Sequence, residues 1–143
     1  MEARIRELFE RYERVFERSL TGDADREEMA SFYAPEFIGA SPAGVMTGKN
    51  DAGFGAMMAE GHARYRAIGA QRMRIRHLRI APIDTRHCVA HVAWTATYAR
   101  PDLPEVMIDF DVHYLVQTLD EEPRIFGWVS GDEQALLRQR GVI

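Results

Sequence analysis

The sequence predicts a single α+β domain in which a curved antiparallel sheet is covered by three helices. Three long segments rich in β-branched and aromatic residues, joined by short turns, predict the centre of the sheet. They run over residues 87–99, 105–118 and 124–130, and a fourth segment, 71–83, leads into them. A sheet of this kind must bury at least one face, and three helical stretches earlier in the chain provide the cover.

Length and composition limit the class of protein. No repeat, linker or low-complexity segment divides residues 1–143, so we expect one domain. With 46% hydrophobic and 28% charged residues, the composition is typical of a soluble globular protein. A net charge of −4 does not favour nucleic-acid binding, and the apolar runs are shorter than the ~20 residues of a membrane span. The lone cysteine, Cys88, fits a reducing compartment, so we expect a cytoplasmic protein without membrane partners.

Three helices follow from the spacing of apolar residues and from start signals. Over residues 2–20 the apolar side chains recur at three- and four-residue steps and form one stripe. A short second helix over residues 25–35 has a start that resembles a capping box and ends at a proline. Asn50 or Asp51 caps a third helix that runs to about residue 68.

The alternation of side chains along the strands predicts which face is buried. The apolar phase of residues 71–83 flips near His77, which indicates a β-bulge that bends the sheet. The later strands keep their phase, and on residues 105–118 the apolar side chains oppose a polar set, Asp109, Asp111 and His113. We expect the apolar phase to lie against the helices.

The order of the elements, together with the segment FYAPEFIGASPAGVMTGKND over residues 32–51, resembles the nuclear transport factor 2-like superfamily, also called the SnoaL-like or ketosteroid-isomerase-like fold. The shared pattern is a helix that ends at "YAP", a strand, a Pro-Gly turn and a G-K entry to the third helix. RIFGWVSGD resembles the last strand of the family. The resemblance implies a cystatin-like α+β barrel whose sheet curves into an open cone, with an apolar pocket on the concave face and dimers through the convex face.

The same resemblance bears on catalysis. Ketosteroid isomerases place a carboxylate base just before the proline of the first-strand turn, where this chain has Ser41. Their helix-one tyrosine falls at Val15 or Phe16, with Tyr12 about one turn away, and Asp109 is the nearest match to their oxyanion acid. Because a serine hydroxyl is too weak a base unaided, we expect no ketosteroid isomerase activity.

Asp109, Asp111 and His113 are the candidate catalytic residues, because the family places carboxylates on this strand. Residues two apart on a strand are separated by ~6.6 Å, so these three side chains converge poorly on one ion. The chain also has no Gly-rich phosphate loop, nucleophile elbow or His/Cys cluster, and we expect no metal and no cofactor. The alternative for these three residues is a polar face in solvent or at a dimer interface.

The resemblance also implies which residues line the pocket. They are Tyr33, Met57, Trp94, Phe110, Phe126, Trp128 and Ser130. A binding protein for a small hydrophobic molecule and a SnoaL-like isomerase, cyclase or hydrolase with a strand carboxylate are the two main hypotheses; a dimerisation module without a ligand is the third. A buried carboxylate of raised pKa facing the pocket favours the enzyme, and a wholly apolar pocket favours binding. We expect a homodimer, because a bare sheet face exposes more apolar surface than monomers usually tolerate.

Overall fold

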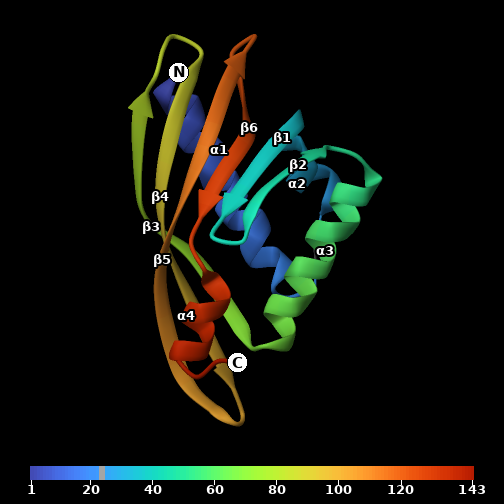
Figure 1. Ribbon diagram of the computed structural model, residues 1–143, viewed down its shortest axis with the longest axis vertical. Helices are drawn as coiled ribbons and strands as arrows, with labels where there is room; N and C mark the ends of the chain where they lie inside the picture. Colours follow the sequence, from blue (N-terminus) through green and yellow to red (C-terminus); the bar gives the residue numbers. More distant parts are fainter. Residues whose placement is uncertain (23–24) are drawn as a thin grey trace.

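The computed structural model describes residues 1–22 and 25–143, and it confirms the α+β class (Figure 1). Within these residues the helices are α1 (Glu2–Ser19), α2 (Arg26–Ser31), α3 (Ala52–Ala67) and α4 (Glu133–Gln139). The strands are β1 (Tyr33–Ser41), β2 (Gly44–Lys49), β3 (Ala70–Pro82), β4 (His87–Arg100), β5 (Leu103–Leu119) and β6 (Glu122–Ser130). No helix of the described chain is both long and apolar enough to cross a membrane.

The strands form one curved, open sheet in the order β2-β1-β6-β5-β4-β3. Neighbouring strands are antiparallel, with the exception of the β1–β6 pair, which is parallel. Figure 1 shows α1 against the sheet, α3 beyond it, and α4 turning back from the end of β6. Side chains of the concave face of the sheet, α1, α3 and α4 line a common cavity, which is the candidate site.

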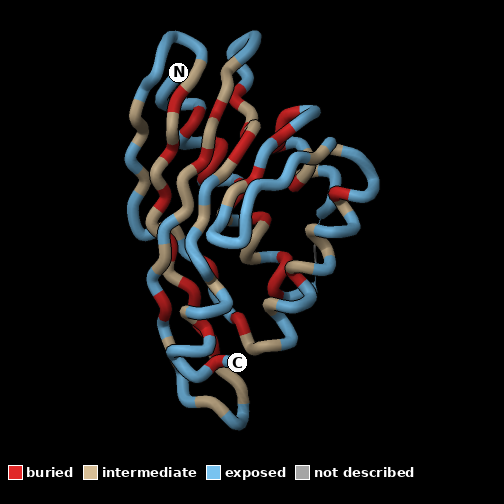
Figure 2. The backbone as a smooth tube through the Cα atoms, viewed as in Figure 1, coloured by how far each residue is buried: buried red, intermediate tan, exposed pale blue. Residues whose placement is uncertain are grey.

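The predicted bulge in β3 is confirmed. The register of β3 against β4 shifts between Ile75 and His77, so the buried side changes phase there. Over residues 87–96 of β4 the side chains alternate between half-buried and buried positions, which Figure 2 shows as alternating colours. This alternation separates the concave face, which packs on the helices, from the convex face.

A second bulge, in β6, was not predicted. A register shift between β5 and β6 leaves Phe126 unpaired between Ile125 and Gly127. The Phe126 ring therefore turns to the convex face, where it meets the edge of His87 with ring centroids 6.1 Å apart. Trp128 stays on the concave side. The prediction that Phe126 and Trp128 share a face is wrong, because the bulge at Phe126 interrupts the alternation of side chains along β6.

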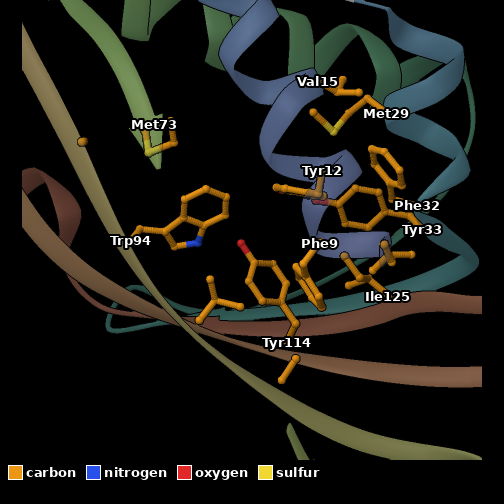
Figure 3. Packing of buried hydrophobic residues seen from close by; sticks show 14 of the residues in the cluster. Phe9, Tyr12, Val15, Met29, Phe32, Tyr33, Met73, Trp94, Tyr114 and Ile125 are labelled. Atoms are coloured by element: carbon orange, nitrogen blue, oxygen red, sulfur yellow. The ribbon is translucent and has the colours of Figure 1, made fainter. Parts of the chain in front are cut away.

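The apolar stripe of α1 forms the centre of the core. Its buried members are Ile5, Leu8, Phe9, Tyr12 and Val15. Figure 3 shows Phe9 and Tyr12 of α1 among the aromatic side chains of Phe32, which follows α2, and of Tyr33, Trp94 and Tyr114 of the sheet. Burying apolar area of this size is the main favourable term in folding, at roughly 25 cal/mol per Å².

The expected end of the second helix at Pro35 is wrong. Helix α2 ends at Ser31, and β1 already begins at Tyr33. The side-chain amide of Asn50 donates to the carbonyl oxygens of Ala30 at 2.8 Å and Tyr33 at 3.1 Å. These bonds satisfy carbonyl groups at the end of α2 and connect this end to the residues just before α3. Pro35 therefore lies within β1 and does not end the helix.

Candidate functional site

A cavity of about 190 Å³ lies between the concave face of the sheet, α1, α3 and α4. Aromatic side chains form most of its wall: Tyr12, Phe16, Tyr33, Tyr65, Trp94, Phe110, Tyr114 and Trp128. Met73 and Val112 add apolar surface, and Ser130 and Glu133 add polar groups. Such a wall suits a small, mostly apolar molecule that is oriented by a few polar atoms.

Glu133 brings a carboxyl group into the wall of this cavity. The preceding residue, Asp132, caps α4 by accepting a 2.9 Å hydrogen bond from the backbone nitrogen of Ala135, which fixes the helix start beside the end of β6. The Tyr65 hydroxyl donates to Glu133 Oε1 at 2.5 Å. Burial raises the pKa of Glu133, and the hydrogen bond from Tyr65 opposes part of that rise. A half-buried carboxyl with a raised pKa is suited to proton transfer.

Two tyrosine hydroxyls supply a second polar point. Tyr12 and Tyr33 are both buried, and their hydroxyl oxygens lie 2.8 Å apart. Burial is the main reason that the pKa of each is raised, so both remain neutral donors at physiological pH. Since one hydroxyl donates to the other, the accepting hydroxyl keeps its own hydrogen for an oxygen atom of a ligand.

Tyr114 and Trp94 lie beside this pair. Figure 3 shows the Tyr114 hydroxyl pointing toward the indole of Trp94, with Tyr12 across from both. The rings of Tyr12 and Tyr114 meet edge to face with centroids 5.9 Å apart, and those of Tyr12 and Trp94 are 6.0 Å apart. Burial, followed by the neighbouring Tyr12, raises the pKa of Tyr114 well above its ordinary value. This aromatic packing holds the hydroxyl groups in place.

Trp128 closes the cavity on the side of β1. A Cβ atom placed on Gly39 would lie 2.8 Å from Cε2 of the Trp128 indole, so the indole rests directly on the backbone of β1. The Trp128 ring also contacts Tyr33, with centroids 5.8 Å apart, and Phe37, with centroids 5.4 Å apart. The indole is therefore fixed by packing on two sides.

Five of the seven residues expected in the pocket line the cavity: Tyr33, Trp94, Phe110, Trp128 and Ser130. Met57 and Phe126 lie elsewhere. Met57 is 43% exposed on α3, which shows that the inner stripe of that helix does not include it. Phe126 lies on the convex face because of the β6 bulge and lines a separate open groove with His87 and Gln117.

The three candidate catalytic residues on β5 lie on the convex face, away from the cavity. Arg76 pairs with Asp109 at 3.0 Å and approaches Asp111 at 4.0 Å, and both aspartate side chains are more than 60% exposed. His113 Nδ1 lies 2.7 Å from His91 Nδ1 on the neighbouring strand. This arrangement is a polar sheet face, and no group of three metal-ligating side chains converges within the described part of the chain.

Sequence reasoning included Tyr33 and Ser130 in the pocket but missed Glu133, Tyr12 and Tyr65. Glu133 follows a helix cap and has no periodic signal of its own, and Tyr12 and Tyr65 belong to apolar helix stripes that indicate only burial. Ser41, at the position of the isomerase base, is the exposed last residue of β1, and its Oγ accepts a 3.2 Å hydrogen bond from the Ala43 backbone nitrogen. The carboxyl therefore comes from a different element than the resemblance implies.

Comparisons with solved structures give the same fold. An NTF2-like protein with a cystatin-like fold from Novosphingobium aromaticivorans matches with a TM-score of 0.71 and 13% identity over 99% of this chain and 88% of that one. An NTF-2 like protein of unknown function from Shewanella oneidensis matches with a TM-score of 0.69 and 13% identity over 92% of this chain and 98% of that one. A ketosteroid isomerase-like protein from Erwinia carotovora atroseptica matches with a TM-score of 0.63 and 11% identity over 90% of this chain and 93% of that one.

A search of the curated proteins finds no match to the sequence. The family model described as NTF2-like protein (DUF6841) matches residues 2–133, which is nearly the whole chain. The match includes every strand of the sheet and ends at the glutamate that faces the cavity. The resemblance seen in the sequence is thereby confirmed, and the chain belongs to the NTF2-like family DUF6841.

Proposed function

We propose that this protein binds a small, largely apolar molecule with a carbonyl oxygen in the cavity and moves a proton on it, with Glu133 as the acid–base group. The observation that carries the proposal is the Glu133 carboxyl, whose pKa is raised by burial, in a wall that is otherwise mostly aromatic. A carboxyl in such a setting is a better base than an exposed one, and it can return the proton as an acid.

The two polar points of the cavity have complementary roles. Tyr65 holds Glu133 Oε1 at 2.5 Å, and no hydrogen bond within the described residues reaches Oε2, so that oxygen is free to take a proton. Oε2 removes a proton from the carbon next to the carbonyl group, and the electron pair moves onto the carbonyl oxygen. The Tyr12–Tyr33 pair donates a hydrogen bond to that oxygen as its negative charge develops. Return of the proton to the same or another carbon completes an exchange or an isomerisation.

Binding without catalysis is the competing function. Two hydrogen bonds favour it: Tyr12 with Tyr33, and Tyr65 with Glu133. Polar groups that satisfy each other in this way can stabilise the shape of the cavity without taking part in catalysis. Asp109 and Asp111 give no support to a strand carboxylate as base. A pure dimerisation module is disfavoured by the cavity itself, since that hypothesis expects a filled cone.

The test uses 2-tetralone, a compact apolar ketone with exchangeable hydrogens next to its carbonyl group. Both tryptophans of the chain, Trp94 and Trp128, line the cavity, so binding is measured by quenching of intrinsic fluorescence. Proton transfer is measured by ¹H NMR as hydrogen–deuterium exchange of the ketone in D₂O. The variants are Glu133→Gln, which keeps the shape and the acceptor for Tyr65, and Asp109→Asn as the control on the convex face.

We expect the wild type and Asp109→Asn to bind the ketone and to accelerate exchange equally. Glu133→Gln should bind it but exchange it about 10²-fold more slowly or worse, as loss of a positioned general base typically costs. Equal exchange by the wild type and Glu133→Gln, with binding intact, would leave binding as the function. Absence of binding in all three proteins would refute both functions for this class of molecule.

A further inference from the structure

A second hollow of about 260 Å³ adjoins the cavity on its outer side, between α3 and α4. We call it the outer groove. Tyr65 and Glu133 line both spaces, and the hydrogen bond between them is therefore the partition. A molecule longer than the cavity can continue into the outer groove by passing beside this pair.

The lining of the outer groove differs from that of the cavity. Its apolar part comes from Ala67, Ile68, Leu137 and Ile143, and Arg64 and Gln134 join Tyr65 and Glu133 as its polar part. Leu137 is buried, whereas Arg64 and Gln134 are exposed. The groove is thus apolar at its base and has a cation and an amide on its solvent side. The lining suits a ligand segment with an apolar stem and a polar end.

Arg64 is exposed, and its guanidinium makes no ion pair or hydrogen bond with the described residues. Arg66, two residues along the same helix, is by contrast engaged with the backbone oxygen of Ser19 at 2.7 Å. An arginine fork left free beside an apolar groove matches a carboxylate, which it binds through two parallel hydrogen bonds.

We infer that the molecule handled by this protein is elongated, with a neutral apolar ring system in the cavity and a carboxylate in the outer groove at Arg64. This inference rests on the proposed function and adds to it the substrate class. The carboxylate belongs at Arg64, because Arg64 is the one cationic side chain of the described residues that lines either space, whereas the Glu133 carboxyl stands at the partition. Arg64 is then the residue that selects acids over their neutral analogues.

The test compares 6-hydroxy-2-naphthoic acid with its methyl ester, which has nearly the same shape but no charge. The hydroxyl and the carboxylate stand at opposite ends of the rigid ring system, so one can reach the tyrosine pair while the other points outward. Affinities for both are measured by calorimetry for the wild type, for Arg64→Gln and for Arg138→Gln. Arg138 is an exposed arginine on α4 that does not line the outer groove, which makes it the matched control.

We expect the wild type and Arg138→Gln to bind the acid about 5-fold more tightly than the ester, as the upper range of a solvent-exposed ion pair gives. Arg64→Gln should bind both equally and should keep the affinity of the wild type for the ester. An ester bound as tightly as the acid by the wild type, or a preference for the acid that survives in Arg64→Gln, would overturn the inference and leave the proposed function intact. Failure of the wild type to bind either compound would overturn the inference, whereas the proposed function is judged separately by 2-tetralone.

Discussion

Glu133 is a carboxyl group that the fold keeps partly out of water. Burial disfavours its charged form, and the Tyr65 hydroxyl returns only part of the lost solvation. The folded protein therefore holds a proton on this group more tightly than the unfolded chain does. Such a group costs stability when it ionises, which is typical of residues kept for function rather than for folding.

The first prediction concerns stability as a function of pH. Because the pKa of Glu133 is raised above its ordinary value of 4.5, its contribution to stability is fully present below pH 4.5 and is lost as the pH rises through the raised value. Glu133→Gln does not titrate and keeps the acceptor for Tyr65. In urea unfolding at pH 4 to 8, the free energy of unfolding of the variant should therefore rise relative to that of the wild type as the pH rises. Parallel stability curves would mean that the carboxyl has no raised pKa.

The second prediction concerns Tyr65. The hydrogen bond from Tyr65 lowers the pKa of Glu133, so Tyr65→Phe should raise that pKa further. The acidic limb of the pH profile for 2-tetralone exchange should then move to higher pH, because the base must be ionised to act. Tyr98→Phe removes a buried hydroxyl that makes no hydrogen bond to Glu133 and should leave the limb in place. An unmoved limb in Tyr65→Phe would show that this bond does not tune the base.

At the scale of the elements, the sheet is shaped by bulges and by close packing against β1. The bulge in β6 separates Phe126 on the convex face from Trp128 on the concave face, and Gly39 lets the indole lie directly on the backbone of β1. A side chain at position 39 would have to displace the ring. The position of one cavity wall thus depends on a residue that has no side chain.

The third prediction follows from this contact. Gly39→Ala should destabilise the protein by about 1–3 kcal/mol, the usual cost of overpacking, and should shift the tryptophan emission as Trp128 moves. The matched control is Gly55→Ala in α3, where nothing lies within 4 Å of the added carbon. That control should be neutral or should stabilise by up to about 1 kcal/mol through helix propensity. Equal stability of the two variants in urea unfolding would show that the indole does not rest on Gly39.

The sequence predicts local structure better than it predicts the site. The helix starts at Asp25 and Asp51 and the bulge near His77 were predictable, because each depends on neighbouring residues in the chain. The face of Phe126 was not predictable, since it depends on how β6 pairs with β5.

The carboxyl of the cavity was missed for a related reason. Glu133 reaches Tyr65 across 68 residues of sequence, a contact that only the packing of α4 against α3 creates. Tyr12 carries the signature of a core residue, and its hydroxyl gains a role only through Tyr33 of a different element. The periodic spacing of apolar residues in the sequence predicts which side chains are buried, but it does not predict which buried hydroxyl groups form hydrogen bonds with each other.

At the scale of the whole molecule, the two faces of the sheet serve different purposes. The concave face holds the cavity, and the convex face carries the Arg76–Asp109 ion pair, the His91–His113 pair and exposed apolar side chains. Among these, Met107 is 57% exposed and Val129 is 48% exposed. Apolar side chains interspersed with paired charges are a composition that suits an interface between copies.

The fourth prediction is that the protein is a homodimer through the convex face. Light scattering at micromolar concentration should return about twice the chain mass of 16.3 kDa. Val129→Asp should shift the mass toward the monomer, because it places a charge in the centre of the apolar contact. Ile83→Asp, at an exposed position just beyond the end of β3, is the control and should remain dimeric. A wild type at the monomer mass would contradict the prediction.

The central claim is that Glu133 is a carboxyl of raised pKa that faces a ligand cavity. A ¹³C NMR titration of the Glu133 side-chain carboxyl, with and without 2-tetralone, tests it most directly, with Glu133→Gln used to assign the signal. We predict a midpoint above 4.5 in the free protein and a change in both midpoint and chemical shift when the ketone is added. A midpoint at the ordinary value that the ketone leaves unchanged would contradict the claim.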